Sequence, residues 1–152
     1  MKQAQFVTIV LLSLALVPGG AHLLELPHKI GLDRDAYMTV QQIYQGWDLM
    51  GIVLVAALIS CLVLAVLSLR QKVPYALALA AFVLLGSSLA IFFIWTFPMN
   101  KATENWTIAP ANWAVLRMQW EYSHAVNAVL TFLALCGATA SSLLWRAGAE
   151  PA

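Results

Sequence analysis

Four long apolar segments constrain this chain more than any other feature of its sequence. They cover about residues 6–24, 49–69, 75–97 and 122–145, and the middle two contain no Asp, Glu, Lys, Arg or His. Each is close to the ~20 residues that a helix needs to cross a bilayer. Because hydrocarbon offers no water, each segment must satisfy its own backbone hydrogen bonds, which favours helix over other structure. The pattern predicts an all-α fold.

The composition supports a membrane environment for these segments. Of the 152 residues, 62% are hydrophobic and only 10% are charged, whereas soluble domains carry about a quarter charged residues. The length allows one domain, residues 1–152. We predict an up-down bundle of four transmembrane helices with two loops at one end, residues 25–48 and 98–120.

The first of these loops contains a candidate interfacial helix. Residues 35–45 place Tyr37, Val40 and Tyr44 on one helical face, which favours a short helix lying on the membrane surface. Aromatic rings prefer the boundary between lipid and water. We therefore expect five tryptophans to mark this boundary: Trp47, Trp95, Trp106, Trp113 and Trp120.

The charges on the two sides of the bundle predict its orientation. The side with both termini has a net charge of +3, from Lys2, Arg70, Lys72, Arg146 and Glu150. The side with the two loops has a net charge of −2, from Lys29, Arg34, Lys101, Arg117, Glu25, Asp33, Asp35, Asp48, Glu104 and Glu121. The positive side of membrane proteins faces the cytoplasm. We therefore predict a plasma or inner membrane protein with both termini cytoplasmic and the loops outside.

The first segment also has a second interpretation. Lys2, the apolar run from Phe6 to Val17 and the small residues after Pro18 resemble a cleaved signal peptide. If the segment is retained, Pro18 and the two glycines that follow it predict a kink before His22.

Two functional classes are disfavoured by the residue content. The net charge is +1 and there is no basic run, so a nucleic-acid partner is not expected. Cys61 and Cys136 both lie in apolar segments and form no C-x-x-C motif. We predict that both are buried packing residues without a redox role.

The ionisable residues suggest one site at the loop end. His22 and Glu25 are three residues apart on the first helix, and Glu121 and His124 are three apart on the last. Residues at this spacing share a helix face. Because the two helices are antiparallel neighbours in an up-down bundle, they would place a pair of imidazoles one turn deeper than a pair of carboxyls.

Three interpretations of this cluster remain open. His22, Glu25, Glu121 and His124 could bind a transition metal such as copper, iron or zinc. Without a metal, a His–Glu pair could act as a general base or bind substrate. In the third interpretation, the carboxyls face water and the histidines bond to loop backbone.

Residues near this cluster have simpler expected roles. His28 follows Pro27 and is expected in the loop, and Asp48 is expected to cap the second helix or to pair with its dipole. Asn127 lies one turn below His124 and could form the pocket floor or an interhelical hydrogen bond. Arg117, four residues before Glu121, is expected to form an exposed ion pair with it.

One stretch of the chain resembles a known family. Its motifs are Pro98-Met99-Asn100 at the end of the third segment, a Trp-containing loop, and Trp120-Glu121-Tyr122-Ser123-His124 entering the fourth. Over roughly residues 86–135 the sequence resembles the DUF1772 membrane proteins, which include anthrone-oxygenase-like enzymes. The matching positions are Pro98, Asn100, Trp120 and His124. Family members have an Arg where this chain has Asn127.

The resemblance implies a four-helix membrane fold and, in its polyketide members, oxidation of an anthrone to an anthraquinone with dioxygen. We therefore expect a membrane-embedded oxidoreductase, a monooxygenase, acting on a hydrophobic substrate between the first and last helices. His124, Glu121, Asn100 and Asn127 would act on the substrate. The alternative is a non-catalytic accessory subunit or a scaffold that binds lipid or another hydrophobic ligand, alone, as a homo-oligomer or with a membrane partner.

Overall fold

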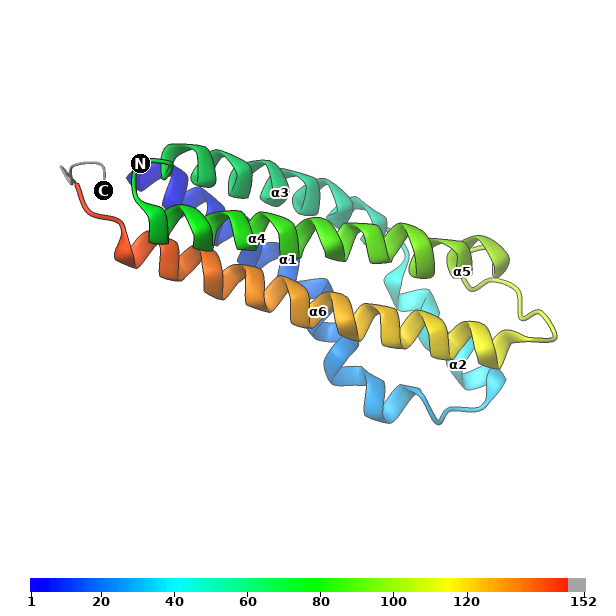
Figure 1. The fold of residues 1–152 in the computed structure, drawn as a ribbon. Coiled ribbons are helices and arrows are strands. Elements are labelled where there is room, and N and C mark those ends of the chain that lie inside the picture. Colours follow the sequence, from blue (N-terminus) through cyan, green and yellow to red (C-terminus); the bar gives the residue numbers. More distant parts are fainter. Residues whose placement is uncertain (148–152) are drawn as a thin grey trace.

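The computed structural model describes residues 1–147, and this part of the chain is helical without strands. Four long helices run side by side as a bundle (Figure 1): α1 (Lys2–Lys29), α3 (Met50–Leu67), α4 (Lys72–Ile91) and α6 (Trp113–Leu144). The predicted all-α fold is confirmed. Glu150, which contributes to the predicted charge asymmetry, lies outside the described residues.

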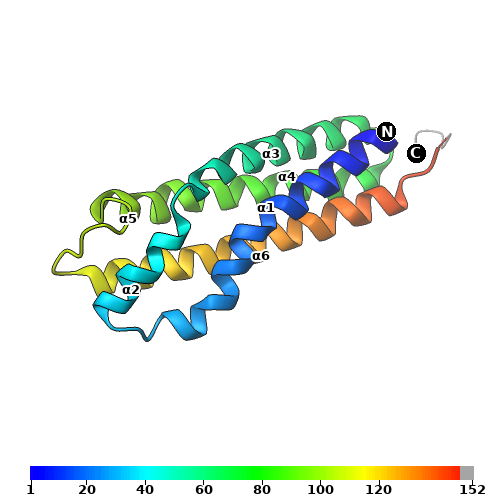
Figure 2. The same ribbon diagram turned by 180° about the vertical axis from the view of Figure 1, so that it is seen from behind.

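The shorter elements all lie at the end of the bundle opposite the N-terminus and the end of α6, which we call the outer end (Figures 1 and 2). They are α2, the 3₁₀ helices η1 and η2, the π-helical segment η3 and α5: Arg34–Gln41, Gln42–Tyr44, Trp47–Leu49, Phe92–Thr96 and Phe97–Ala102. Four stretches are long and apolar enough to cross a membrane: Lys2–Lys29, Trp47–Leu67, Lys72–Ala102 and Trp113–Leu144.

The long helices follow one another around the bundle in chain order. α1 packs against α3 and α6, and α4 packs against α3 and α6. The first and last long helices are therefore neighbours, as the up-down topology predicted. α1 and α6 approach closely at Gly19, where an added Cβ would lie 3.3 Å from the Ala128 Cα atom.

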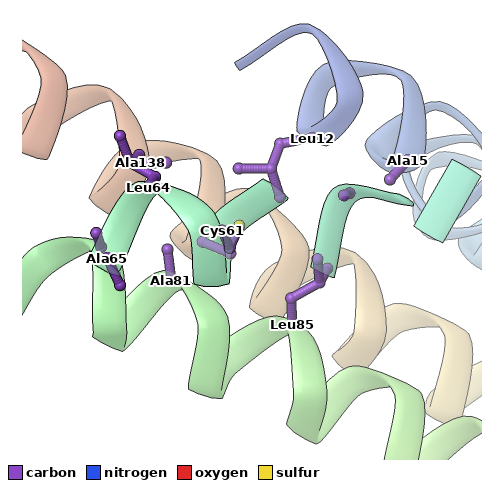
Figure 3. Packing of buried hydrophobic residues seen from close by; sticks show 11 residues of the cluster. Leu12, Ala15, Cys61, Leu64, Ala65, Ala81, Leu85 and Ala138 are labelled. Carbon is purple, nitrogen blue, oxygen red and sulfur yellow. The ribbon is translucent and has the colours of Figure 1, made fainter. Parts of the chain in front are cut away.

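The inner half of the bundle is held together by small side chains and a few leucines (Figure 3). A cluster of buried residues joins all four long helices: Leu12, Ala15, Ala57, Cys61, Leu64, Ala65, Ala78, Ala81, Leu85, Ala134 and Ala138. Hydroxyls add links between helices, since Thr8 donates to the Ser60 carbonyl at 3.1 Å and Ser141 to the Pro74 carbonyl at 2.7 Å. Such close contacts of small residues are the main source of helix association in lipid.

Three of the four spans are longer than predicted. The third covers Lys72–Ala102 rather than 75–97. α1 continues through Pro18 and Pro27 to Lys29, and α6 begins at Trp113 rather than near Tyr122. The apolar pattern ends earlier because it marks the part of a helix that crosses hydrocarbon. Both helices continue beyond that region with polar residues, and these extra turns carry groups of the site described below.

The helix predicted in the first loop is present as α2 and packs on the outer end of the bundle. α2 begins after Asp33, whose carboxylate accepts the Ala36 N–H at 2.9 Å. Its Tyr37 is fully buried and packs edge-on against Trp106, with ring centroids 5.2 Å apart. The apolar face of α2 therefore covers the outer end of the bundle. Trp106 and Trp120 belong to this second buried core, together with Tyr37.

Candidate functional site

A cavity of about 900 Å³ lies among the four long helices in the outer half of the bundle. α1 and α6 form its back wall, with residues on one helical face of each: Ala15, Pro18, Gly19, His22, Trp120, His124, Asn127 and Thr131. α3, α4 and η3 contribute mainly apolar and aromatic residues: Met50, Leu54, Val55, Leu89, Phe92 and Phe93. Its lining is that of a small-molecule site, mostly apolar with a few polar groups.

Two imidazoles meet on the back wall, as the residue spacing predicted. His22 on α1 and His124 on α6 have ring centroids 4.3 Å apart and planes tilted by 39°. Trp120 packs edge-on against both, at 4.8 Å from His22 and 4.2 Å from His124. Close packing thus fixes both rings, and Nδ1 of the buried His22 has no hydrogen-bond partner.

Polar side chains continue below the imidazoles. Asn127 lies one turn further along α6, is 8% exposed, and its Oδ1 has no hydrogen-bond partner. Thr131 on α6 and Ser88 on α4 are buried beside it in the cavity lining. Asn127 therefore lines the cavity, which agrees with the first of its two predicted roles, a pocket floor. An unpaired amide in such surroundings is unfavourable unless a ligand group pairs with it.

The two glutamates do not line this cavity. Glu121 is fully buried, and Lys29 lies between it and Glu25. The Lys29 Nζ atom is 3.2 Å from Glu121 Oε1 and 3.3 Å from Glu25 Oε2. It also lies over the rings of Tyr44 and Trp120, 4.5 and 5.0 Å from their centroids. A single buried ammonium is therefore shared by the two carboxylates.

Two tyrosines from the loop complete this buried cluster. Tyr37 donates a hydrogen bond to Glu121 Oε1 at 2.8 Å, and Tyr44 donates to Glu25 and lies 2.8 Å from Lys29 Nζ. Burial, and next the Glu121 carboxylate, raise the pKa of Tyr37. Burial and the hydrogen bond to Glu25 likewise raise the pKa of Tyr44. Both phenols therefore remain protonated donors over the physiological pH range.

The predicted metal ligands do not fit a metal in this arrangement. Within residues 1–147, no three His, Cys, Asp or Glu side chains are grouped so that they could hold a metal ion. The Lys29 ammonium occupies the place between the carboxylates where a cation would bind, and His22 Nδ1 is 4.0 Å from Glu25. The imidazoles face the cavity while the carboxylates face the loop.

Asn100, expected to act on the substrate, supports the aromatic wall. Its Oδ1 accepts hydrogen bonds from the indole N–H of Trp120 at 2.7 Å and of Trp106 at 3.3 Å. It also lines the cavity. Because Trp120 packs on both imidazoles, Asn100 fixes the ring that orients them.

Three neighbouring residues differ from their predictions in whole or in part. His28 lies within α1 rather than in the loop and is exposed. Asp48 forms no capping hydrogen bond, but it lies just before α3, which is compatible with its predicted pairing with the helix dipole, and it lines the cavity mouth. Arg117 does not pair with Glu121, because it donates to the Leu32 carbonyl at 2.6 Å and lies over the Trp113 ring.

Both cysteines are free. Cys61 is buried in the inner core. Cys136 is exposed, because its face of α6 points out of the bundle, so the prediction of burial was wrong for this residue.

Lys29, Tyr37 and Tyr44 were not predicted as site residues. The sequence contains a pattern that points to Lys29, because this residue lies four residues after Glu25 and seven after His22 on one helical face. The pattern was missed because the first helix was predicted to end before Pro27. No spacing rule connects Tyr37 with Glu121, which are brought together only by the path of the loop.

No family model, curated protein or solved structure matches this chain. The resemblance to the anthrone-oxygenase-like proteins therefore remains a prediction from short motifs. The chemistry of the site has to be argued from its geometry.

Proposed function

We propose that this protein binds an uncharged hydrophobic small molecule in the outer-half cavity. The observation that carries the proposal is the mostly apolar lining of the cavity with polar side chains gathered on its back wall, among them His124 and Asn127. Asn127 is 8% exposed, and its Oδ1 has no hydrogen-bond partner in the protein. A ligand with a hydroxyl or N–H group would satisfy this oxygen, while its apolar part packs against the phenylalanines opposite.

The charges around the cavity favour an uncharged ligand. Asp48 and Glu104 line its mouth, and none of the described lining residues is Lys or Arg. A carboxylate or phosphate would therefore lose its hydration without gaining a cation. The replacement of the family's Arg by Asn127 points the same way.

The same site supports a proposal about chemistry. His124 lies in the cavity and could accept a proton from an acidic C–H or O–H group of the ligand. The resemblance suggests an anthrone. Loss of a ring CH₂ proton to His124 gives a carbanion, and reaction with dioxygen replaces the two hydrogens by a carbonyl oxygen. The second oxygen atom leaves as water, so one dioxygen is consumed for each anthraquinone.

A specific observation favours the alternative of a binding protein without catalysis. Neither glutamate contacts an imidazole within hydrogen-bond distance, since His22 and Glu25 are 4.0 Å apart and Glu121 pairs with Lys29 and Tyr37. The histidines thus lack the carboxylate partner that orients a general base in many enzymes. Binding of a ligand without its conversion to a product would support a binding protein without catalysis.

Ligand binding can be tested with 2-naphthol and the full-length protein in nanodiscs. Removing one hydrogen bond should weaken binding by about tenfold in Asn127→Ala, since such a bond contributes ~1 kcal/mol or more. His124→Ala should weaken it comparably. His28→Ala is the matched control, because His28 is exposed and outside the cavity lining. Unchanged affinity in both cavity variants would overturn the proposal.

Catalysis is tested separately with anthrone itself. The oxygenase hypothesis predicts anthraquinone formation with one dioxygen consumed per product, and a loss of about 10²-fold or more in His124→Ala. Binding of 2-naphthol without turnover of anthrone would leave the binding proposal intact. It would remove the oxygenase hypothesis for this substrate.

A further inference from the structure

The exposed residues of the cavity lining come from only two segments of the chain. One segment is 45–55, before and within α3, and the other is 93–107, from η3 through α5 to the following loop. Every lining residue from α1 and α6 is buried or half-buried. The cavity therefore opens between the outer ends of α3 and α4, away from the α1–α6 side where the sequence predicted the substrate to lie.

The two segments give this opening a polar and an apolar part. At the outer end its exposed residues are polar: Gln45, Asp48, Glu104, Asn105 and Thr107. Deeper along the helices they are apolar: Met50, Val55, Phe93 and Phe97. The apolar four belong to stretches that are long and apolar enough to cross a membrane. This part of the opening therefore faces lipid.

The opening ends where α3 and α4 come into contact. An added Cβ at Gly86 would lie 3.9 Å from a methyl group of Leu58, so the helices touch at that level. Further out, Gly51 has nothing within 4 Å of an added Cβ. The helices are therefore separated at Gly51, about two turns beyond the Leu58–Gly86 contact.

The helix on the other side of the opening is irregular at this level. Phe92–Thr96 is π-helical, and the consecutive residues Phe92 and Phe93 both line the cavity together with Phe97. Short π-helical segments within α-helices occur frequently at functional sites. Here the segment turns aromatic side chains toward the opening.

We propose that this opening is a lateral window through which an uncharged hydrophobic molecule passes from the bilayer into the cavity. Gly51 and Val55 on one side and Phe93 on the other set the width of the window. The nature of the passing molecule rests on the proposed function, whereas the window itself is a property of the helices and can be tested without a specific ligand.

The test uses the uncharged, lipid-soluble reagent 3-trifluoromethyl-3-phenyldiazirine with the full chain in liposomes. After illumination, mass spectrometry maps carbene insertion by residue. Thr131 should be labelled although it is buried, because it lines the cavity. Phe132, which is 52% exposed, is the internal standard for lipid contact, and the buried Ala134 outside the cavity gives the background.

Two variants narrow the window. Val55→Trp and Gly51→Leu should lower the labelling of Thr131 to the background level of Ala134 and leave Phe132 unchanged. Ile52→Trp is the matched control, because Ile52 is 70% exposed on the same helix but does not line the cavity. It should leave Thr131 labelled as in the natural protein.

The outcomes separate this proposal from the proposed function. Background labelling of Thr131 in the natural protein, or full labelling in both window variants, would overturn the window even if 2-naphthol binds. Loss of labelling in the window variants would support it even if 2-naphthol does not bind. In that case only the proposed function would fail.

Discussion

Lys29 is the residue on which the outer end of the bundle depends most. Its side chain is 3% exposed and connects Glu25 of its own helix with Glu121 of α6, while Tyr44 of the loop contacts the same ammonium. A carboxylate as buried as that of Glu121 is unfavourable without a cation beside it. Lys29 thus joins α1, α6 and the loop behind the imidazole pair.

Replacing this lysine should therefore destabilise the protein. Lys29→Met leaves the Glu121 carboxylate buried without its cation and should lower the free energy of unfolding by about 3–5 kcal/mol. The double variant Lys29→Met/Glu121→Gln should recover part of that loss, because it removes the uncompensated charge. Denaturation in detergent measures both, with the exposed Lys101→Met as control. Equal stability of Lys29→Met and Lys101→Met would contradict the assignment.

Because of Tyr37, the stability of the folded protein should depend on pH in the alkaline range. Its pKa is raised above the ordinary 10.0, so the folded chain holds this proton more tightly than the unfolded chain does. The stabilisation is therefore complete below about pH 10 and is lost as the pH rises above that value.

Tyr37→Phe should consequently reduce the loss of stability above about pH 10. At neutral pH the same variant should be less stable by about 1.5–3 kcal/mol, because Glu121 loses a hydrogen-bond donor. Unfolding curves at several pH values measure both effects. Tyr122→Phe, at an exposed position of α6, should change neither. If the stability of Tyr37→Phe falls above about pH 10 as steeply as that of the natural protein, the proposed role of the Tyr37 phenol is wrong.

At the scale of elements, α6 uses two adjacent faces for different purposes. Trp120, His124, Asn127 and Thr131 recur at helical spacing and line the cavity, whereas Glu121 faces Lys29 and Tyr37. Further along, Gly137 allows close contact with α4, since an added Cβ would lie 3.2 Å from the Leu77 carbonyl oxygen. The helix thereby combines a site with a tight packing surface.

Because of this contact, the addition of a single methyl group at Gly137 should lower the stability of the protein. The Leu77 carbonyl belongs to the α4 backbone and cannot move without shifting that helix. Gly137→Ala should lower stability by about 1–3 kcal/mol through overpacking. Gly20→Ala, where the added methyl meets no atom within 4 Å, should be neutral or stabilising because alanine favours helix. Comparison of their unfolding midpoints measures the difference, and equal effects would contradict the close approach.

The helices and the first loop also show which parts of the fold and of the site could be predicted from the sequence. Apolar runs without charge predicted four helices and their order, and the His-x-x-Glu and Glu-x-x-His spacings brought His22 and His124 together correctly. The spacing gave no information on which helix face meets the loop. The carboxyls were therefore assigned to the cavity, although the path of α2 brings Tyr37 onto Glu121 and leaves only the imidazoles inside.

At the scale of the molecule, an apolar exterior surrounds a site that lies near one end. The N-terminus and the end of α6 lie at one end of the bundle, and α2 and α5 lie at the other (Figure 1). The exposed residues that line the cavity belong to segments at that outer end. The charge asymmetry of the sequence predicts that the end with the termini faces the cytoplasm. The site would then receive its ligand from the outer half of the bilayer.

Orientation can be measured by labelling intact cells with a membrane-impermeant maleimide. In a chain with Cys61→Ala and Cys136→Ala, Lys101→Cys at the outer end should react, whereas Lys72→Cys at the inner end should react only after lysis. Both positions are exposed in the structure. The opposite labelling pattern would reverse the orientation and place the cavity in the cytoplasmic half of the membrane.

The most direct test of the binding proposal follows the three histidine side chains by NMR. In the ¹⁵N-histidine-labelled protein in nanodiscs, titration with 2-naphthol should shift the ring resonances of His22 and His124 together along one saturable curve. His28, which is exposed and outside the cavity, should not follow them. If His22 and His124 do not respond, or if His28 shifts in parallel with them, the cavity is not the binding site that we propose.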